Sequence, residues 1–473
     1  MSISKKTRTS TWWALNSTRA RLTAVGASAL ALALLTTSVI VWTSPANPIN
    51  QAIASRTDTA GKDPLVVERN QLLSKVVELQ RLLDESKTSL TATKAEMASI
   101  QQALWSAEGQ LEAASSGKSS KNTAAKKTTT KPTATTAAIT APSKAEIVNP
   151  AAPYFGLMTE QAPFSWSTYD ATAARVGYKP DVVGYFGGWD EAFRANAVTR
   201  SWQRGTLPIL TWESRPIDAK NNQVDEPDYT LPAIIGDPEA GVAGKYDDYL
   251  HQYARDIVAT GLPLGIRLNH EMNGTWYPWS ETTGSGEPIN GNRVGDYAKM
   301  WQHVHDIFEA EGANDLVVWI WAPNIINNLS ASHKSVEFME GYYPGDEYVD
   351  WVGLSGYLRP PYKAENDFTF DYTFGASIDQ LRQITDKPIF LAEIGASEVG
   401  GQKVQWVTSL FEGLARPENA DILGFNWFNL AVTSYTEGEL ATNDWRIESR
   451  PESLAAFTAG LERPGSRFVL TPN

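Results

Sequence analysis

Cysteine is absent from the 473 residues of this chain. Its absence excludes disulfides, metal sites built on thiolates and a cysteine nucleophile. It does not decide the compartment, because a domain with a large core needs no covalent staples. Histidine is scarce, and the five histidines show no spacing typical of metal ligands. We therefore predict no metal and no cofactor, although the acidic loop residues Asp225, Glu226 and Asp228 leave calcium open as an alternative to solvated charge.

The chain also lacks a surplus of positive charge beyond residue 148. Residues 1–148 carry 18 Lys and Arg against 10 Asp and Glu, which leaves 23 against 44 for residues 149–473. A domain with this excess of negative charge would repel the phosphates of nucleic acid. Thirteen of the 17 tryptophans lie in the same part of the chain. We expect a neutral partner, for which tryptophan faces suit sugar stacking, although most of these rings should belong to the core.

Charged residues are missing from a long stretch near the amino terminus. Residues 22–42 run for 21 positions without a charge, which is long enough to cross a bilayer. Five basic residues within 1–21 precede the stretch and predict that this end stays in the cytoplasm. The alternative is a cleaved signal peptide, but its apolar core is usually shorter and no Ala-x-Ala site follows. We therefore predict a single-pass anchor in the cell membrane, with the remaining chain outside the cytoplasm.

Proline and glycine are absent from residues 72–108, in which apolar residues recur at 4,3 spacing. Val76, Leu83 and Leu90 begin one row of six apolar positions, and Ser86 and Thr93 weaken the second row. This pattern predicts a coiled coil over 64–113, hence a homo-oligomer of undetermined strand number. Residues 114–148 are rich in Ala, Thr, Ser and Lys, a composition that predicts a disordered linker.

The region from 149 to 466 alternates apolar runs with helical patterns. Several runs are apolar throughout, as expected for parallel strands that are covered on both faces. Eight strand–helix units predict a (β/α)8 barrel. An open doubly wound sheet is the alternative, but it would usually carry a glycine-rich phosphate turn after its first strand, and 155–159 has none. The predicted strands are 154–159, 181–187, 207–213, 262–271, 316–324, 351–357, 388–395 and 422–429.

Two of the predicted strands carry a glutamate at or near their carboxyl end. Glu271 ends the fourth strand and Glu393 lies near the end of the seventh, so both should face the mouth of the barrel. A pair of carboxyl groups beside aromatic rings is the equipment for glycosidic bond cleavage. Burial and a neighbouring negative charge should raise the pKa of Glu271, the expected acid. Trp212, Trp276 and Trp427 lie at the same predicted strand ends.

The residues around both glutamates resemble glycoside hydrolase family 26. The resemblance rests on His270, Glu271 and Trp276, with Arg267 ahead of them, and on the run 389–395 around Glu393. It covers roughly 150–465 and implies a retaining mechanism in a (β/α)8 barrel. It also implies that Glu271 is the acid/base and Glu393 the nucleophile.

The same resemblance assigns roles to neighbouring residues. It implies that Trp276 lines the cleft, that Tyr357 hydrogen-bonds the nucleophile and that Trp427 is a platform for the −1 sugar. His270 should position Glu271 or bind a sugar hydroxyl. Arg267 or Tyr357 should keep Glu393 ionised, and we also expected Trp212 to contact substrate.

The family contains β-1,4-mannanases, mixed-linkage β-1,3-1,4-glucanases and β-1,3-xylanases. We expect an endo-β-1,4-mannanase. Mannanases, however, tend to carry an Asp where this chain has Ser355, and this departure keeps the other two specificities as alternatives. Two other classes stay open: a glycan-binding protein that has lost its chemistry, and a surface scaffold whose coiled coil is the function.

Overall fold

The computed structural model describes Lys75, Arg81 and residues 139–220, 223–436 and 439–473. The predicted anchor at 22–42 lies outside the described residues, as does the predicted coiled coil at 64–113 except for Lys75 and Arg81, which are helical. In the part of the chain that is described, no helix is long and apolar enough to cross a membrane. Both features therefore stay predictions.

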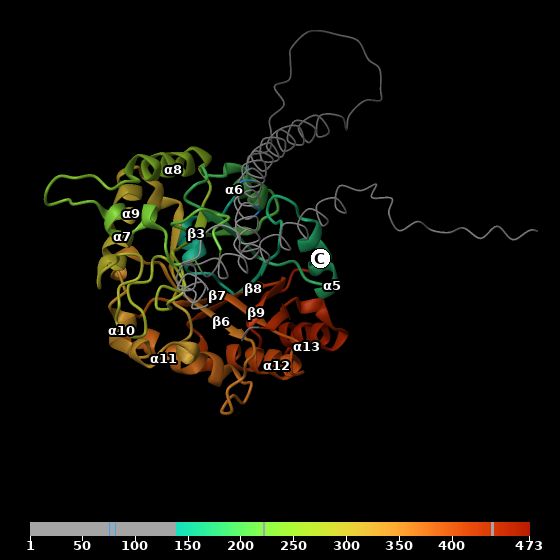
Figure 1. Ribbon diagram of the computed structural model, residues 1–473. Coiled ribbons are helices and arrows are strands. Elements are labelled where there is room, and N and C mark those ends of the chain that lie inside the picture. The colour runs from blue at the N-terminus through green and yellow to red at the C-terminus, as the bar shows by residue number, and fades with distance from the viewer. Residues whose placement is uncertain (1–74, 76–80, 82–138, 221–222, 437–438) are drawn as a thin grey trace, which may run out of the picture. The chain divides into compact units, whose positions relative to one another are not determined.

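Eight parallel strands form a closed barrel in the order of the sequence, so the predicted (β/α)8 fold is confirmed. The helices surround the strands (Figure 1). The strands of the barrel are β1 Tyr154–Met158, β2 Val182–Gly188, β3 Leu207–Glu213, β4 Leu264–Leu268, β5 Val317–Trp321, β6 Trp351–Leu358, β7 Ile389–Ala396 and β8 Ile422–Phe428. A hairpin of β9 Ala431–Thr436 and β10 Glu439–Asp444 follows the last strand.

The helices follow the strands as the alternating pattern predicts. The α-helices are α4 Lys144–Val148, α5 Ser167–Val176, α6 Ala195–Gln203, α7 Leu231–Ile235, α8 Asp247–Thr260, α9 Asp296–Ala310, α10 Val336–Glu340, α11 Ala376–Ile384, α12 Lys403–Leu414 and α13 Pro451–Glu462. The short helices are η1 Pro227–Tyr229, η2 Ala313–Asp315, η3 Ile326–Asn328, η4 Ala331–His333, η5 Asp346–Tyr348, η6 Asp371–Gly375, η7 Pro417–Asn419 and η8 Ile447–Ser449.

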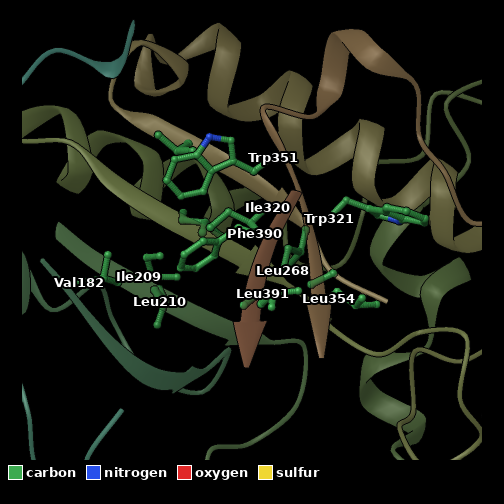
Figure 2. Packing of buried hydrophobic residues seen from close by; sticks show 14 of the residues in the cluster. Val182, Ile209, Leu210, Leu268, Ile320, Trp321, Trp351, Leu354, Phe390 and Leu391 are labelled. Carbon is green, nitrogen blue, oxygen red and sulfur yellow. The ribbon is translucent and has the colours of Figure 1, made fainter. Parts of the chain in front are cut away.

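Apolar side chains fill the interior of the barrel below its mouth, so this part of the barrel is a packed core and not a channel. Ile209 of β3, Ile320 of β5 and Phe390 of β7 are at most 1% exposed and lie together in Figure 2. A Cβ on Gly265 of β4 would lie 3.0 Å from Ile209 and 3.1 Å from Ile320, so a larger residue would push these side chains apart by a few tenths of an ångström. Successive residues of a strand face opposite sides, so the neighbouring positions point to the helices.

The predicted boundaries of the barrel domain were too narrow at both ends. Residues 144–148 were assigned to a disordered linker, but they form α4, where Ser143 and Glu146 make a reciprocal capping box. Ile147 is 1% exposed, and the carbonyl of Val148 accepts a bond from the indole of Trp351 at 3.1 Å. At the other end, the carbonyl of Thr471 accepts a bond from the Lys179 amide at 2.8 Å. The folded unit therefore extends beyond 149–466.

Candidate active site

Glu271 lies on a tight turn after β4, not on the strand as the sequence suggested. The strand ends at Leu268, and Asn269 and Glu271 adopt positive φ values of 44° and 56°. Such backbone costs about 1–3 kcal/mol per residue and persists only where the surroundings hold it. The Glu271 amide donates to the carbonyl of Ala322 at 2.7 Å, and the Asn269 side chain bonds Ser214 at 2.8 Å. The turn thus fixes the direction of the Glu271 side chain.

The environment of Glu271 favours its protonated form. The residue is only 7% exposed, and the indole of Trp276 donates to its Oε2 at 2.8 Å. Burial is the main cause that raises the pKa of Glu271, and the negative charge of Glu393 adds to it; Arg267 and the bond from Trp276 oppose this shift. The predicted direction of the pKa shift agrees with this environment. A carboxyl group that holds its proton near neutral pH can donate it to a leaving oxygen.

Glu393 has the opposite surroundings. Its Oε2 accepts a bond from the Arg267 guanidinium at 2.6 Å, and its Oε1 accepts one from the Tyr357 hydroxyl at 2.5 Å. Burial and the charge of Glu393 raise the pKa of Tyr357 well above its ordinary value, so Tyr357 remains a donor. Both residues that we expected to support the anion therefore contact it. Glu393 thus accepts hydrogen bonds from a cation and a phenol.

Arg267 is itself held by the barrel interior. It is fully buried, and its guanidinium also donates to Thr211 of β3 at 3.3 Å and to Ser355 of β6. Three strands thus position one cation under Glu393. Burial and the charge of Glu393 raise the pKa of Glu271, whereas Glu393 accepts bonds from Arg267 and Tyr357, so the two surroundings differ as those of a general acid and a nucleophile do.

A second buried ion pair lies beside the first. Arg215 donates twice to Glu213, at 3.0 and 3.1 Å, and its guanidinium covers the ring of Tyr277 at 4.8 Å. His270 is 1% exposed, and its Nδ1 lies 3.9 Å from Glu213. Burial lowers the pKa of His270 well below its ordinary value, and the charges of Arg267 and Arg215 add to this, so the ring is neutral. No residue in the described part of the chain hydrogen-bonds its Nδ1.

Two tryptophans that we assigned to the substrate are part of the core. Trp212 is fully buried and stacks on Tyr253 of α8 with ring centroids 4.3 Å apart. Trp427 is also fully buried and packs edge-on against Trp406 of α12 and Phe457 of α13. Both rings point from their strands to the helices, so neither presents a face to a sugar. These assignments are corrected.

The structure brings a different tryptophan to the site. Trp445 follows the β9–β10 hairpin and packs against Tyr357, with ring centroids 5.1 Å apart, and against Phe428 at 5.5 Å. Its carbonyl accepts the indole bond of Trp427 at 2.7 Å. Sequence reasoning missed Trp445 because it belongs to no strand run. Only its place shortly after the eighth strand could have indicated it.

Metal ligands do not gather in the described residues: no group of three or more Asp, Glu, His or Cys side chains could hold an ion there. Two of the three acidic loop residues, Glu226 and Asp228, have partners within the protein. Lys245 lies 2.6 Å from Asp228, and the side chain of Gln223 donates to Glu226 at 2.7 Å.

Comparison with known proteins agrees with this geometry. Residues 196–398 match the model of glycosyl hydrolase family 26, a range that includes both carboxyl groups. This stretch of the barrel is therefore similar to that family.

Endoglucanase H of Acetivibrio thermocellus is 30% identical over 295 residues, which are 60% of this chain and 28% of the relative. A mannan endo-1,4-beta-mannosidase of Bacillus subtilis is 28% identical over 249 residues, 50% of this chain and 63% of the relative. The solved catalytic domain of an endo-β-1,4-mannanase from Bacillus sp. JAMB-750 has a TM-score of 0.47 and 19% identity, and covers 66% of this chain and 86% of that one. The chain thus spans less than two thirds of either curated relative.

The correction of Trp212 makes a testable prediction. Trp212→Ala should lower the free energy of unfolding by about 3–5 kcal/mol, as expected for loss of a buried indole. Below the melting temperature, kcat/KM on a cleaved glycan should change less than about threefold, because the ring contacts helices and not the cleft. Urea unfolding and initial rates would measure both. A large rise in KM without loss of stability would restore Trp212 to the substrate.

Proposed function

We propose that this chain is a retaining endo-β-1,4-mannanase. The observation that carries the proposal is the pair of unlike carboxyl groups at the mouth of the barrel: Glu271 bonded to Trp276, and Glu393 bonded to Arg267 and Tyr357. Glu271 is the acid/base in this proposal, and Glu393 is the nucleophile. The similarity to a Bacillus mannosidase supports mannan as the substrate.

The mechanism follows from the two environments. Glu393 attacks the anomeric carbon while Glu271 protonates the leaving oxygen, and a covalent glycosyl-enzyme forms. Glu271, now ionised, then takes a proton from water, which attacks the same carbon and restores the β configuration. The Arg267 guanidinium keeps the carboxylate of Glu393 in place before attack and after its release.

Specificity for a β-glucan is the alternative to mannan, and it is favoured by the residue at position 355. Ser355 stands where mannanases tend to carry an Asp, and its hydroxyl accepts a bond from Arg267 directly beneath the nucleophile. The similarity to an endoglucanase points the same way. A mixed-linkage β-1,3-1,4-glucanase is therefore the alternative, and a β-1,3-xylanase of the same family is a further one. A glycan-binding protein without activity is disfavoured because both carboxyl groups and their partners are in place.

The experiment that tests the function is a comparison of substrates. Initial rates on β-mannan, barley β-glucan and β-1,3-xylan, with product sizes, should be highest on mannan and should yield oligosaccharides. Proton NMR should show the β anomer first. Higher turnover of β-glucan would establish the alternative, and binding of a glycan without cleavage would support a binding protein.

The acid/base role of Glu271 predicts a substrate-dependent defect. Glu271→Gln should lower kcat/KM on the natural glycan by about 10²–10⁴-fold, because the amide cannot protonate the leaving oxygen. An aryl glycoside with a good leaving group should lose far less in the glycosylation step. Trp212→Phe serves as a control outside the site. Equal losses on both substrates would contradict the assignment.

We further propose that the enzyme is tethered to the cell membrane through residues 22–42 and is held outside the cytoplasm as an oligomer. The uncharged 21-residue stretch and the heptad pattern of 64–113 support this proposal. Fragment 64–473 should sediment as a dimer or trimer, and fragment 139–473 as a monomer. Leu83→Asp with Leu90→Asp places charge in the apolar row and should dissociate the longer fragment. A monomeric 64–473 at micromolar concentration would refute the oligomer.

A further inference from the structure

A short segment after the hairpin controls the position of Trp445. Residues 444–449 run from the end of β10 through η8, and the Trp445 ring in this segment packs on Tyr357. Tyr357 in turn donates its hydroxyl to Glu393. A movement of Trp445 would therefore change the packing of a residue that bonds the nucleophile.

The side chain of Lys403 binds this segment through hydrogen bonds. It is the first residue of α12, and its side chain is 1% exposed. Its Nζ donates to the carbonyl of Arg446 at 2.7 Å, to the hydroxyl of Ser449 at 2.9 Å and, at 3.4 Å, to the carbonyl of Asp444. The two carbonyls belong to the residues on either side of Trp445. One ammonium group thus fixes the backbone before and after the ring.

Glu398 completes the arrangement. Its Oε1 lies 3.3 Å from the Nζ of Lys403 and also accepts bonds from the hydroxyls of Ser449 and Ser453, the second at 2.7 Å. Glu398 lies in the loop between β7, which carries the nucleophile, and α12. The anchor therefore links the loop after the nucleophile strand to the segment that carries Trp445.

The position of Lys403 runs against local preference. A cation at the amino end of a helix is unfavourable in the field of the helix dipole. Burial is the largest influence on this side chain and lowers the pKa of Lys403 to about 8, although the charge of Glu398 opposes the shift. Residues that break a local rule are expected at functional sites, where another gain offsets the cost. Here the gain is a fixed segment beside the nucleophile.

We propose that Lys403 is a positioning residue for the reaction: by anchoring segment 444–449 it keeps Trp445 against Tyr357, and thereby Tyr357 against Glu393. The inference rests on the proposed glycosidase function and adds a residue that does not touch the substrate. Its effect on catalysis passes through Trp445, so removal of Trp445 should make Lys403 unimportant for the rate.

Arg467 provides a matched control. Its guanidinium also holds backbone carbonyls, those of Asn419 and Ile422 at 3.0 Å each and that of Leu414 at 3.3 Å. Ile422 begins β8, so this cation lies at the end of the barrel opposite the site. Arg467→Met and Lys403→Met each remove a cation that binds backbone carbonyls, but only the second is near Trp445.

The first measurement is amide hydrogen exchange in fragment 139–473. The amides of Trp445 and Ile447 are bonded to the carbonyl of Leu430 at 3.0 Å and to the side chain of Asn429 at 2.7 Å. Both should exchange at least about tenfold faster in Lys403→Met and at the wild-type rate in Arg467→Met. Ser449→Ala, a milder change, should move them in the same direction. Unchanged exchange in Lys403→Met and Ser449→Ala would overturn the inference.

The second measurement is a double-mutant cycle on the glycan that the wild-type protein cleaves. Lys403→Met should lower kcat/KM by about 10–100-fold, the size expected when a reacting group is misplaced. In the Trp445→Ala background, the same change should lower it less than twofold, since coupled residues are not additive. Arg467→Met should lower it less than twofold in either background. Equal losses from Lys403→Met in both backgrounds, or faster exchange with an unchanged rate, would refute the positioning role.

The two measurements separate this inference from the proposed function. If the wild-type protein cleaves none of the three glycans, the glycanase proposal fails and the catalytic part of the inference falls with it. Hydrogen exchange would then still decide whether Lys403 anchors the segment. If the wild type cleaves a glycan and only the cycle fails, the glycanase proposal stands and Lys403 is structural.

Discussion

The site depends on one buried ion pair, that between Arg267 and Glu393. A charge inside a barrel is costly unless a partner and hydrogen bonds replace water. Here the guanidinium lies 2.6 Å from Glu393. The hydroxyls of Thr211 and Ser355, on other strands of the barrel, accept further hydrogen bonds from it. Glu213 repeats the arrangement with Arg215. Glu271 is the carboxyl group of the three that has no arginine bond, and it is therefore the one suited to keep a proton.

The barrel and the meeting of two carboxyl groups at its mouth could be predicted from the sequence because each has a strong local signal. Uninterrupted apolar runs indicate strands that are buried on both faces, and polar residues at their ends mark the mouth. The prediction that Trp212 and Trp427 contact the substrate was wrong for a related reason. When both faces of a strand are buried, an apolar ring does not show whether it points to the barrel interior or to the helices. Only a polar residue next to it in the sequence shows this. Glu213 and Asn426 face inward, so Trp212 and Trp427, one position away, had to face the helices.

Other features had weak signals or none. The Ser143–Glu146 capping box could have shown that the linker ends before residue 143, but the Ala- and Thr-rich composition concealed it. Trp445 and Lys403 come together only after the hairpin folds back, so no spacing in the chain predicts their contact. Such placements depend on tertiary structure and become visible only in three dimensions.

The turn after β4 has a consequence for engineering. Asn269 and Glu271 both adopt backbone conformations that most residues avoid. The strained turn fixes the direction of the Glu271 side chain, so stability and activity compete at this point of the chain. Glycine at position 269 would relieve the backbone strain, but it would also make the turn more flexible and the position of the Glu271 side chain less defined. A more heat-resistant version of the protein is therefore better sought away from this turn, for example in the packing of α4 against the barrel.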